Sequence, residues 1–547
     1  MKNILIAIRS IFKKGRHNVM KIVSLGIGLA VGLVLIAKVY FEQSYDDFYP
    51  DRDRVYQVWA KYQQNGGELK DYPQTSGGIA PTMQQQIPEI ETVTRYTSFG
   101  DWTFTMTDTK MKYSGRCIIA DSCFFDILPR PMLIGNAKEV LSTPMYVLIS
   151  SRIAKNIGGD VIGENFTVDN SPGRTMTIGG VFEEVPENSH SRYDVIVSMA
   201  SAGRFMWEGS PTNMLGNDRY ISYVKLHKGV NPLALEEQVR TFVNSYFPPE
   251  EQQKVGLSID FSFHKLDNLH KELPQVKRMT WILSLLAFAL IFTAVMNYIL
   301  IVISSIVNRS KEVAVHKCYG ASENNIHGMM FGEALVHIVL SLILALLLIL
   351  AFRGTVEELL ATSLDSLLLS NGSLVLLGIC ILGFFVSGFM PGSLYARIPV
   401  ASAFRNYREN KRIWKKALLL VQFVATGFLV TMLVFVARQY TFMVNDRPGY
   451  AYENLAYCGL AGVDSTSRAK ILDEVMRLPG VAAATTVYQL PFEHASGNNI
   501  LLPGGTQELF NIADLYWVGN GYLDMMEIPV IQGRSFTENV TNSREVM

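Results

Sequence analysis

NRSKEVAVHKCYGASENNIHGMMFGE, residues 308–333, is a short polar link between two long apolar segments. These segments cover residues 279–307 and 329–352. At about 1.5 Å of rise per residue, the first would form a helix of roughly 43 Å, longer than the ~30 Å hydrocarbon core of a bilayer. We therefore expect a membrane protein in which the link joins two spanning helices, the first of them tilted or continued outside the bilayer.

The link carries the local signals of a helix, a tight turn and a second helix. Residues 309–317 can continue the preceding helix, and Gly320 suits a left-handed C-cap. Ser322 can cap the next helix, with Glu323 near the positive end of its dipole. Glu333 lies further along that helix; we expect it to pair with a basic residue of the link or of the N-terminal segment, or simply to reach interfacial water.

Three more apolar runs complete a predicted set of five spanning helices: 22–41, 373–390 and 417–436. In the first of these, Gly28 and Gly32 form a GxxxG pair, which suits close helix packing. Lys38, near the end of the same run, is expected to extend to the membrane interface.

The N-terminal segment 1–21 combines six Lys/Arg with apolar residues that share one helical face (Ile4, Ile8, Ile11 and Phe12). This pattern predicts an amphipathic helix on the membrane surface. The alternative is the basic start of a signal peptide, but the apolar run that follows is long and has no small-residue cleavage site.

The distribution of Lys/Arg in short loops predicts the orientation. The link 308–327 is basic, and the amphipathic link 393–416 has seven Lys/Arg, whereas the loop 353–372 has Arg353 alone. We therefore expect the N-terminus and both basic links to be cytoplasmic. Residues 43–276 and 439–547 would then form extracytoplasmic domains.

Residues 43–276 mix strand-like and helix-like patterns and predict an α+β domain, with two lobes as one option. The predicted strands are 54–62, 112–120, 145–150, 165–169, 175–184, 193–198 and 256–264, and the predicted helices are 79–86, 151–157 and 233–246. Four residues, Glu183, Glu184, Glu187 and His190, allow an enzymatic interpretation. The simpler interpretation, a strand end followed by a polar loop, is preferred because no hydrolase or protease motif accompanies them.

Composition excludes several other classes. The 547 residues have a net charge of +0, which gives no electrostatic basis for a nucleic-acid partner. The five cysteines are scattered, so neither a metal site nor a disulfide framework is predicted, although a Cys117–Cys123 disulfide stays open.

Parts of the chain repeat. Residues 124–126 and Gly135 match residues 522–524 and Gly533, and the segments around the first and fifth apolar runs also match. A repeat of this kind predicts a second module that begins at 393–416 and breaks off inside its extracytoplasmic domain. The chain would then be a shortened form of a longer protein, or else a natural five-helix variant.

At this point the sequence resembles a known family. Arg309, Glu312–Val315, Lys317, Gly320–Ser322 and Glu333 are similar to the signature of FtsX/MacB-type ABC permeases, and residues 43–276 resemble the MacB-type periplasmic core domain. The resemblance implies that Arg309, Glu312, Lys317, Gly320, Ala321 and Ser322 contact an ATP-binding subunit, with Glu333 in a coupling role. His316, Cys318 and Tyr319 depart from the family pattern inside this contact segment.

The resemblance implies a permease subunit in the cell inner membrane that transmits ATP-driven motion of a separate ATPase to its periplasmic domains. The chain has no P-loop, so it is not expected to bind ATP by that route, and no cofactor or catalytic residue is predicted. Expected partners are the ATPase, the lipid bilayer and a periplasmic or outer-membrane protein. Export of peptides or amphiphilic compounds is the favoured job; the alternative is a membrane receptor or scaffold that senses a periplasmic ligand or regulates cell-envelope enzymes without transport.

Overall fold

The structure is a computed structural model. It describes residues 18–64, 67–168, 171–216, 219–304, 306–370, 372–375, 377–378, 381–383, 413–445, 449–460, 463–491, 496–502 and 508–536. The predicted amphipathic segments 1–21 and 393–416 therefore lie almost entirely outside the described residues, and the predicted helix 373–390 lies largely outside them.

The chain divides into two compact units. The first comprises Met1–Val168 and Gly173–Thr426, and the second comprises Gly427–Met547 with the short stretch Asp169–Pro172.

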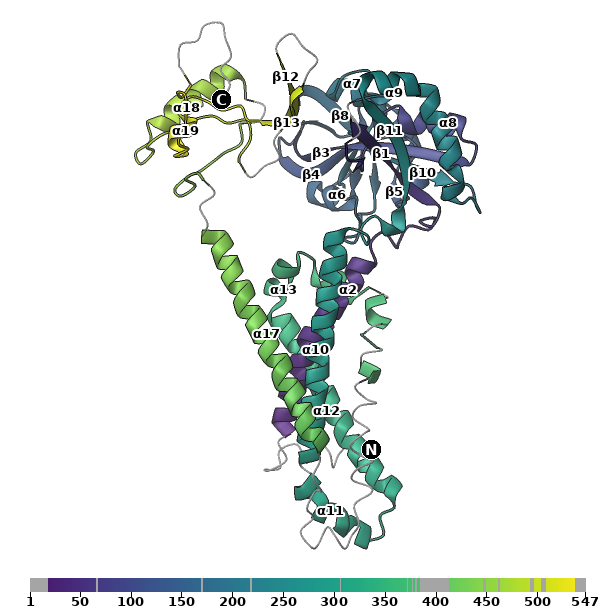
Figure 1. Ribbon diagram of the computed structural model, residues 1–547, viewed down its shortest axis with the longest axis vertical. Coiled ribbons are helices and arrows are strands. Elements are labelled where there is room, and N and C mark those ends of the chain that lie inside the picture. The colour runs from purple at the N-terminus through teal and green to yellow at the C-terminus, as the bar shows by residue number, and fades with distance from the viewer. Residues whose placement is uncertain are drawn as a thin grey trace. The chain divides into compact units, whose positions relative to one another are not determined.

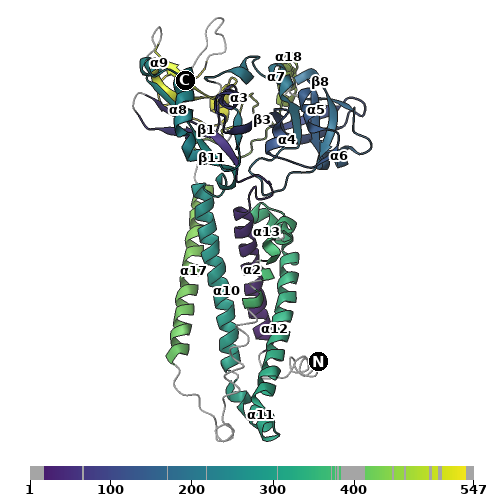
Figure 2. The same ribbon diagram turned by 90° about the vertical axis from the view of Figure 1, so that its right-hand side faces the viewer.

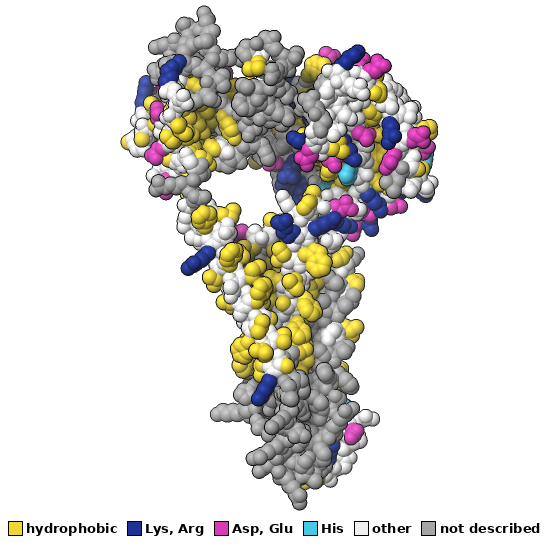
Figure 3. Space-filling view, viewed as in Figure 1, with side chains coloured by type: hydrophobic (Ala, Val, Ile, Leu, Met, Phe, Trp, Pro, Cys, Tyr) yellow, Lys and Arg dark blue, Asp and Glu magenta, His cyan; other side chains and the backbone are white. Residues whose placement is uncertain are grey.

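Three long helices of the first unit, α2 (Asn18–Gln43), α10 (Pro274–Ser304) and α12 (Glu323–Ala351), pack side by side (Figures 1 and 2). Their shared core is apolar and includes Leu25, Leu29, Tyr298, Ile338 and Ala345. Each helix is long and apolar enough to cross a membrane, and so is a fourth, α17 (Ile413–Asn445), from Leu419 onward. Hydrophobic side chains cover the surface of the long helices, as expected for contact with lipid (Figure 3).

Helix α2 packs closely because it presents glycines to both neighbours. A Cβ at Gly28 would lie 2.3 Å from Ala294 Cβ, and one at Gly32 would lie 2.5 Å from Ile291 Cγ1, both on α10. On the side facing α12, a Cβ at Gly26 would lie 2.8 Å from Leu344 Cδ2. A larger residue at Gly28 would require the two helices to move apart, because Ala294 Cβ is fixed to the backbone of α10, whereas at Gly26 and Gly32 the side chains of Leu344 and Ile291 would have to shift.

Between α2 and α10 the chain forms an α+β domain, called the core domain below, built on an 11-stranded sheet. The strands are β1 (Val55–Gln64), β2 (Lys70–Tyr72), β3 (Ile90–Met106), β4 (Lys112–Ala120), β5 (Met132–Ile134), β6 (Tyr146–Ser150), β7 (Asn165–Val168), β8 (Ser171–Phe182), β9 (Val195–Ser198), β10 (Ile221–Leu226) and β11 (Leu257–Lys265). The main path runs β11-β1-β10-β3-β4-β9-β6-β8-β5, with β2 beside β1 and β7 beside β3 and β8. The β4–β9 and β6–β8 pairs are parallel.

Helices cover this sheet in separate groups. Helices α3 (Ile79–Gln86) and α8 (Glu236–Tyr246) share an apolar cluster with β1, β10 and β11, and α9 (Pro249–Val255) contacts β11. Helix α6 (Ser151–Ile157) packs in a second cluster, formed mostly by β3, β4 and β6–β9. Helices α4 (Phe124–Ile127) and α5 (Ala137–Ser142) belong to a third cluster, which also contains Tyr49. One continuous sheet thus contributes side chains to three separate apolar clusters.

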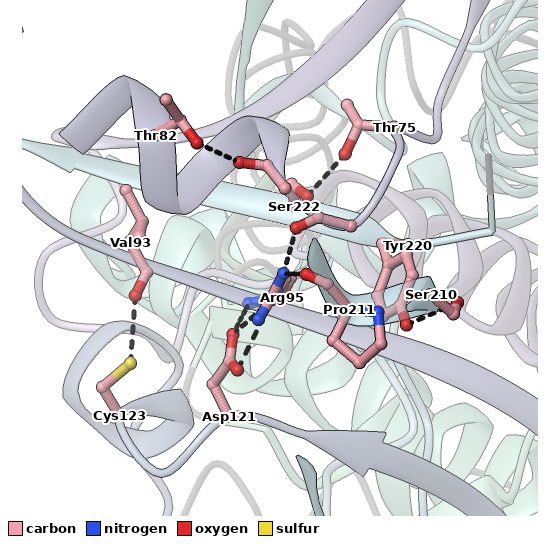
Figure 4. A network of polar contacts seen from close by, with 12 residues as sticks. Thr75, Thr82, Val93, Arg95, Asp121, Cys123, Ser210, Pro211, Tyr220 and Ser222 are labelled. Atoms are coloured by element: carbon pink, nitrogen blue, oxygen red, sulfur yellow. Dashed lines mark hydrogen bonds and ion pairs between the residues drawn. The ribbon is translucent and has the colours of Figure 1, made fainter. Parts of the chain in front are cut away.

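A polar network around Arg95 fixes the loops beside α3 (Figure 4). Arg95 Nε lies 3.2 Å from Asp121 Oδ2, and its Nη1 donates to the carbonyl oxygens of Gly77 and Pro211. Burial raises the pKa of Asp121, and the adjacent Arg95 guanidinium opposes that rise. The network is internal and ties three separate segments to the sheet.

The second unit contains α18 (Ser465–Met476), the antiparallel pair β12 (Ser496–Leu501) and β13 (Glu508–Leu515), and α19 (Tyr522–Met525). Helices α19 and α4 begin 398 positions apart, at Tyr522 and Phe124. Each is followed by a glycine with positive φ at the same spacing, Gly533 (φ 94°) and Gly135 (φ 84°). The segments paired by the sequence repeat therefore share a short helix and a positive-φ glycine, but they differ before the helix, where Cys123 has φ -90° and Gly521 has φ 73°.

Candidate functional site

The link at one end of the helix bundle is a rigid turn between two helices. Helix α11 (Ile306–Cys318) is followed by Gly320, whose φ is +84°. Gly320 N donates to Lys317 O and Ala321 N donates to His316 O, both at 3.0 Å. This pair of bonds is a Schellman motif, which satisfies carbonyl groups that the helix end would otherwise leave open. The prediction of a glycine C-cap is confirmed.

The next helix begins with a side-chain cap. Ser322 Oγ accepts from Asn325 N at 3.3 Å, and Glu323 lies in the first turn of α12. Upstream, Val313 and Ala314 are buried in the core of the bundle. The link is thus fixed on both sides by a helix cap.

The predicted contact residues fall into two groups around this turn. Gly320 and Ser322 are exposed, whereas Glu312, Lys317 and Ala321 are half-buried. Arg309 lies in α11, where the structure describes its backbone only. Tyr319, one of the departures from the family pattern, has 89% of its surface exposed. The turn therefore offers an accessible surface around residues 319–322.

Glu333 is buried beside the start of α2. Its Oε1 lies 4.0 Å from Lys21 Nζ, and Lys21 Nζ also donates to Asn18 Oδ1 at 3.2 Å. Lys21 is the last residue of the basic segment 1–21. Pairing of Glu333 with a basic residue of this segment was one of the alternatives predicted from the sequence. The pair connects α12 to α2 near the link.

At the opposite end of the bundle, Lys38 is buried in contacts with other polar groups, and its extension to the membrane interface stays a prediction. Its Nζ lies 2.6 Å from Glu42 Oε1 and donates to Thr362 Oγ1 at 2.9 Å. Glu42 Oε2 lies 2.6 Å from His270 Nε2, and the His270 ring stacks on Tyr45. Burying these charges is tolerable because each one is paired.

A second buried network, centred on Asp46, joins the segment that follows α2 to the core domain. Asp46 is fully buried and accepts from Ser189 Oγ at 3.0 Å and His190 N at 3.3 Å; its Oδ2 lies 2.7 Å from His190 Nδ1. His190 Nε2 contacts the hydroxyl of buried Tyr223, whose pKa is raised by burial.

The four residues of the enzymatic interpretation do not form a common site. His190 belongs to the internal Asp46 network, Glu183 pairs with Arg130, and Glu184 pairs with Arg152. Within the described part of the chain, no group of three or more His, Cys, Asp or Glu is placed to hold a metal. Cys117 and Cys123 are both free thiols, so the disulfide left open by the sequence is absent.

Sequence reasoning missed the outer network of Lys38, Glu42, His270 and Thr362. His270 and Thr362 lie 228 and 324 positions from their partners on α2, so no local pattern brings them to that helix. The available local signals were Lys38, a charge inside an apolar run, and Glu42, four residues later on the same helical face.

Comparison with known proteins identifies two parts of the chain. A family model described as a MacB-like periplasmic core domain matches residues 20–242, and one described as an FtsX-like permease C-terminal matches residues 284–400. No curated protein matches the chain.

Two solved structures are similar to part of the chain. One is a domain of a protein assigned as a permease from Porphyromonas gingivalis, with 32% identity and a TM-score of 0.37, covering 40% of this chain and 91% of that one. The other is the extracellular domain of the noncanonic ABC-type transporter YknZ from Gram-positive bacteria, with 10% identity and a TM-score of 0.27, covering 38% of this chain and 98% of that one.

The two family matches together span more than half of the chain and follow each other in the order of the structure, from α2 through the core domain to α10 and α12. The chain belongs to the FtsX/MacB-type ABC transporter permeases, membrane proteins with a MacB-like periplasmic core domain and FtsX-like permease helices.

Proposed function

We propose that this permease receives ATP-driven motion from a separate ATP-binding subunit at its α11–α12 link and passes that motion to the periplasmic core domain. The observation that carries the proposal is the doubly capped, accessible turn at residues 319–322. It lies at the end of α10 and α12 opposite to the core domain (Figures 1 and 2). With the core domain periplasmic, a link one membrane crossing away would be cytoplasmic, where an ATPase can reach it.

Length and packing support a mechanical role. Helix α10 has 31 residues and would be about 46 Å long, enough to cross the ~30 Å core and continue beyond it. Its close contact with α2 at Gly28 and Gly32 allows the two helices to move as one body. In this proposal Arg309, Glu312, Lys317, Gly320, Ala321 and Ser322 form the contact with the ATPase.

We further propose export of peptides or amphiphilic compounds taken from the periplasmic side of the inner membrane. The buried charges found in the described parts of α2, α10 and α12 are Lys21, Lys38, Glu42 and Glu333. Lys21, Lys38 and Glu42 lie near the ends of α2, Glu333 lies ten residues after the start of α12, and all four are engaged in side-chain contacts. The buried titratable side chain at the middle of α12 is His337, and no buried Asp, Glu, Lys or Arg lies at the middle of the described parts of these helices. A path for a charged solute would need such groups at its centre, so the helices are better suited to transmit motion than to conduct a solute. The chain itself would have no enzymatic role.

Co-purification tests the ATPase contact. The chain is expressed with candidate ABC ATP-binding subunits, and wild type is compared with Glu312→Ala and Gly320→Pro. Proline has a fixed negative φ, so it cannot adopt the +84° observed at Gly320. Both variants are expected to lose bound ATPase, whereas Lys277→Ala, at an exposed site at the other end of α10, is expected to keep it.

Full retention of the ATPase by both link variants would refute the contact. A wild-type chain that recovers no ATPase would instead favour the receptor or scaffold alternative.

A further inference from the structure

The segment after α12, residues 352–370, is a compact element packed against α2. It contains α13 (Arg353–Leu360) and α14 (Leu364–Leu368). Leu367 is fully buried in a small apolar cluster with Ala37 and Phe41 of α2. We call this element the outer strut.

The outer strut is internally braced. Glu357 Oε1 accepts from Leu364 N and from Arg353 Nε, each at 2.9 Å. Ser363 Oγ caps α14 by accepting from Ser366 N at 3.3 Å. Ala361 ends α13 in a left-handed conformation with φ 48°, which costs a non-glycine residue energy and persists because its surroundings fix it. These contacts make the strut a defined turn between two helices.

Two polar contacts connect the strut to different parts of the molecule. Thr362 Oγ1 accepts from Lys38 Nζ of α2 at 2.9 Å. The next residue, Ser363, donates its backbone N–H to Glu187 Oε2 of the core domain at 3.0 Å. Glu187 lies in the loop that also supplies Asn188, Ser189 and His190 to the network at the end of α2. The Ser363–Glu187 contact therefore joins the strut, which follows α12 in the chain, directly to the core domain, in addition to the contacts of the strut with α2.

We propose that the outer strut is a second mechanical connection, which carries displacement of α12 directly to the core domain, with Thr362, Glu187 and Lys38 as positioning residues. Helix α12 has the link at one end and the strut at the other, and its 29 residues would measure about 44 Å. A push at residues 319–322 moves the start of α12, and a stiff helix delivers that movement to residues 352–370. This inference rests on the proposed function, because it assigns the route by which the link's motion arrives.

The test measures whether α12 and the core domain move as one body. Nitroxide labels are attached at Leu346→Cys on α12 and at Trp207→Cys in the core domain, which replace side chains that are 54% and 64% exposed. The native cysteines are replaced beforehand, and the complex with the ATPase is measured with and without a non-hydrolysable ATP analogue. With the strut intact, the distance between the labels is expected to keep a narrow distribution in both states.

The strut variant combines Thr362→Val with Glu187→Ala, which removes both acceptors. Its distance distribution is expected to broaden and to shift when the ATP analogue binds, while ATPase co-purification and basal ATP hydrolysis stay unchanged. The conservative pair Thr362→Ser with Glu187→Gln keeps an acceptor at each site and is expected to restore the narrow distribution. Glu184→Ala serves as the matched control, because Glu184 lies in the same loop but contacts surface Arg152.

A strut variant with the same narrow, ATP-insensitive distribution as the intact protein would overturn the inference. Loss of the ATPase from the intact protein would overturn the proposed function instead, so the two failures are distinguishable.

Discussion

At the residue scale, the outer end of α2 depends on charges that are stable only as a group. Lys38 and Glu42 are both buried, and their side chains lie within hydrogen-bonding distance of each other and of His270 or Thr362. A buried ion pair adds little net stability against apolar residues of the same size, but removal of one partner leaves the other uncompensated. The network is therefore sensitive to single substitutions and tolerant of paired ones.

Glu42→Gln is expected to lower the free energy of unfolding by about 3 kcal/mol, since Lys38 would then be buried beside a neutral group. The paired replacement Lys38→Met with Glu42→Leu is expected to cost clearly less. Chemical unfolding of the detergent-solubilised protein measures both. The exposed pair Arg477–Glu474 provides the control, because Arg477→Ala at a surface ion pair is expected to change stability by under about 0.5 kcal/mol. Equal losses for the single and paired changes at α2 would argue against this account.

Glycine at position 28 is required by the approach of α10. In Gly28→Ala the new methyl group would meet Ala294 Cβ at 2.3 Å, so the helices must separate, at an expected cost of about 1–3 kcal/mol. Gly427→Ala is the matched control, because a Cβ at this glycine of α17 has no atom within 4 Å. Helix propensity alone would make both changes favourable. Stabilisation of both variants in thermal unfolding would show that close packing at Gly28 is unimportant.

At the element scale, the sequence predicted local structure well wherever the pattern was regular. Helices α3 and α6 and strand β4 have the predicted bounds. Strand β3 was missed because an irregularity between Ser98 and Asp101, around Gly100 with φ 73°, breaks its apolar alternation. Strand β10 was missed because it is short and nearly every residue is buried, which leaves no period of two to detect.

The same distinction applies to the candidate site. Its caps at Gly320 and Ser322 depend on a few adjacent residues and could be predicted from them. Apart from the Lys38–Glu42 pair, which is four residues apart on α2, the polar contacts of the outer network and the strut with other segments join residues separated by 176 to 324 positions, and only the folded chain brings them together. The described helices also extend beyond the predicted apolar runs. Helix α10 begins at Pro274 instead of 279, and α17 continues to Asn445, into the predicted domain 439–547.

The β1–β11 pair gives the core domain a titratable element near neutral pH. His264 on β11 stacks on Trp59 of β1 at 4.1 Å, and burial lowers the pKa of His264 below the ordinary value of 6.5. Between these two pKa values the unfolded chain binds more protons than the folded one. The contribution of His264 to stability is therefore present above pH 6.5 and is lost as the pH falls below it.

His264→Phe keeps an aromatic ring against Trp59 but cannot be protonated. The wild type is expected to lose more stability than this variant when the pH falls from 7 to 5, by at most about 1.4 kcal/mol per pH unit for one proton. Apparent melting temperatures of the two proteins are measured in the same buffers at pH 7 and pH 5. The other histidines are present in both proteins, so their contributions cancel when the two pH profiles are subtracted. Parallel pH profiles for the two proteins would exclude a role for His264.

At the scale of the whole molecule, the proposed function requires that the link and the periplasmic domains lie on opposite sides of the membrane. The chain supplies native probes for this arrangement. Cys318 in the link and Cys458 in the second unit are both exposed free thiols, while Cys117 is buried and Cys123 donates its thiol to Val93 O. The orientation expected from the basic loops puts Cys318 in the cytoplasm and Cys458 outside.

Single-cysteine variants that retain only Cys318 or only Cys458 turn this orientation into a measurement. In sealed right-side-out vesicles, a membrane-impermeant maleimide is expected to label Cys458 directly and Cys318 only after detergent is added. Detergent-solubilised samples check that both thiols can react. Bound ATPase should then slow the labelling of Cys318 and leave Cys458 unchanged, because Cys318 lies two residues before the Gly320 turn. Direct labelling of Cys318 in sealed vesicles would place the link outside, and a cytoplasmic ATPase could then no longer act on it.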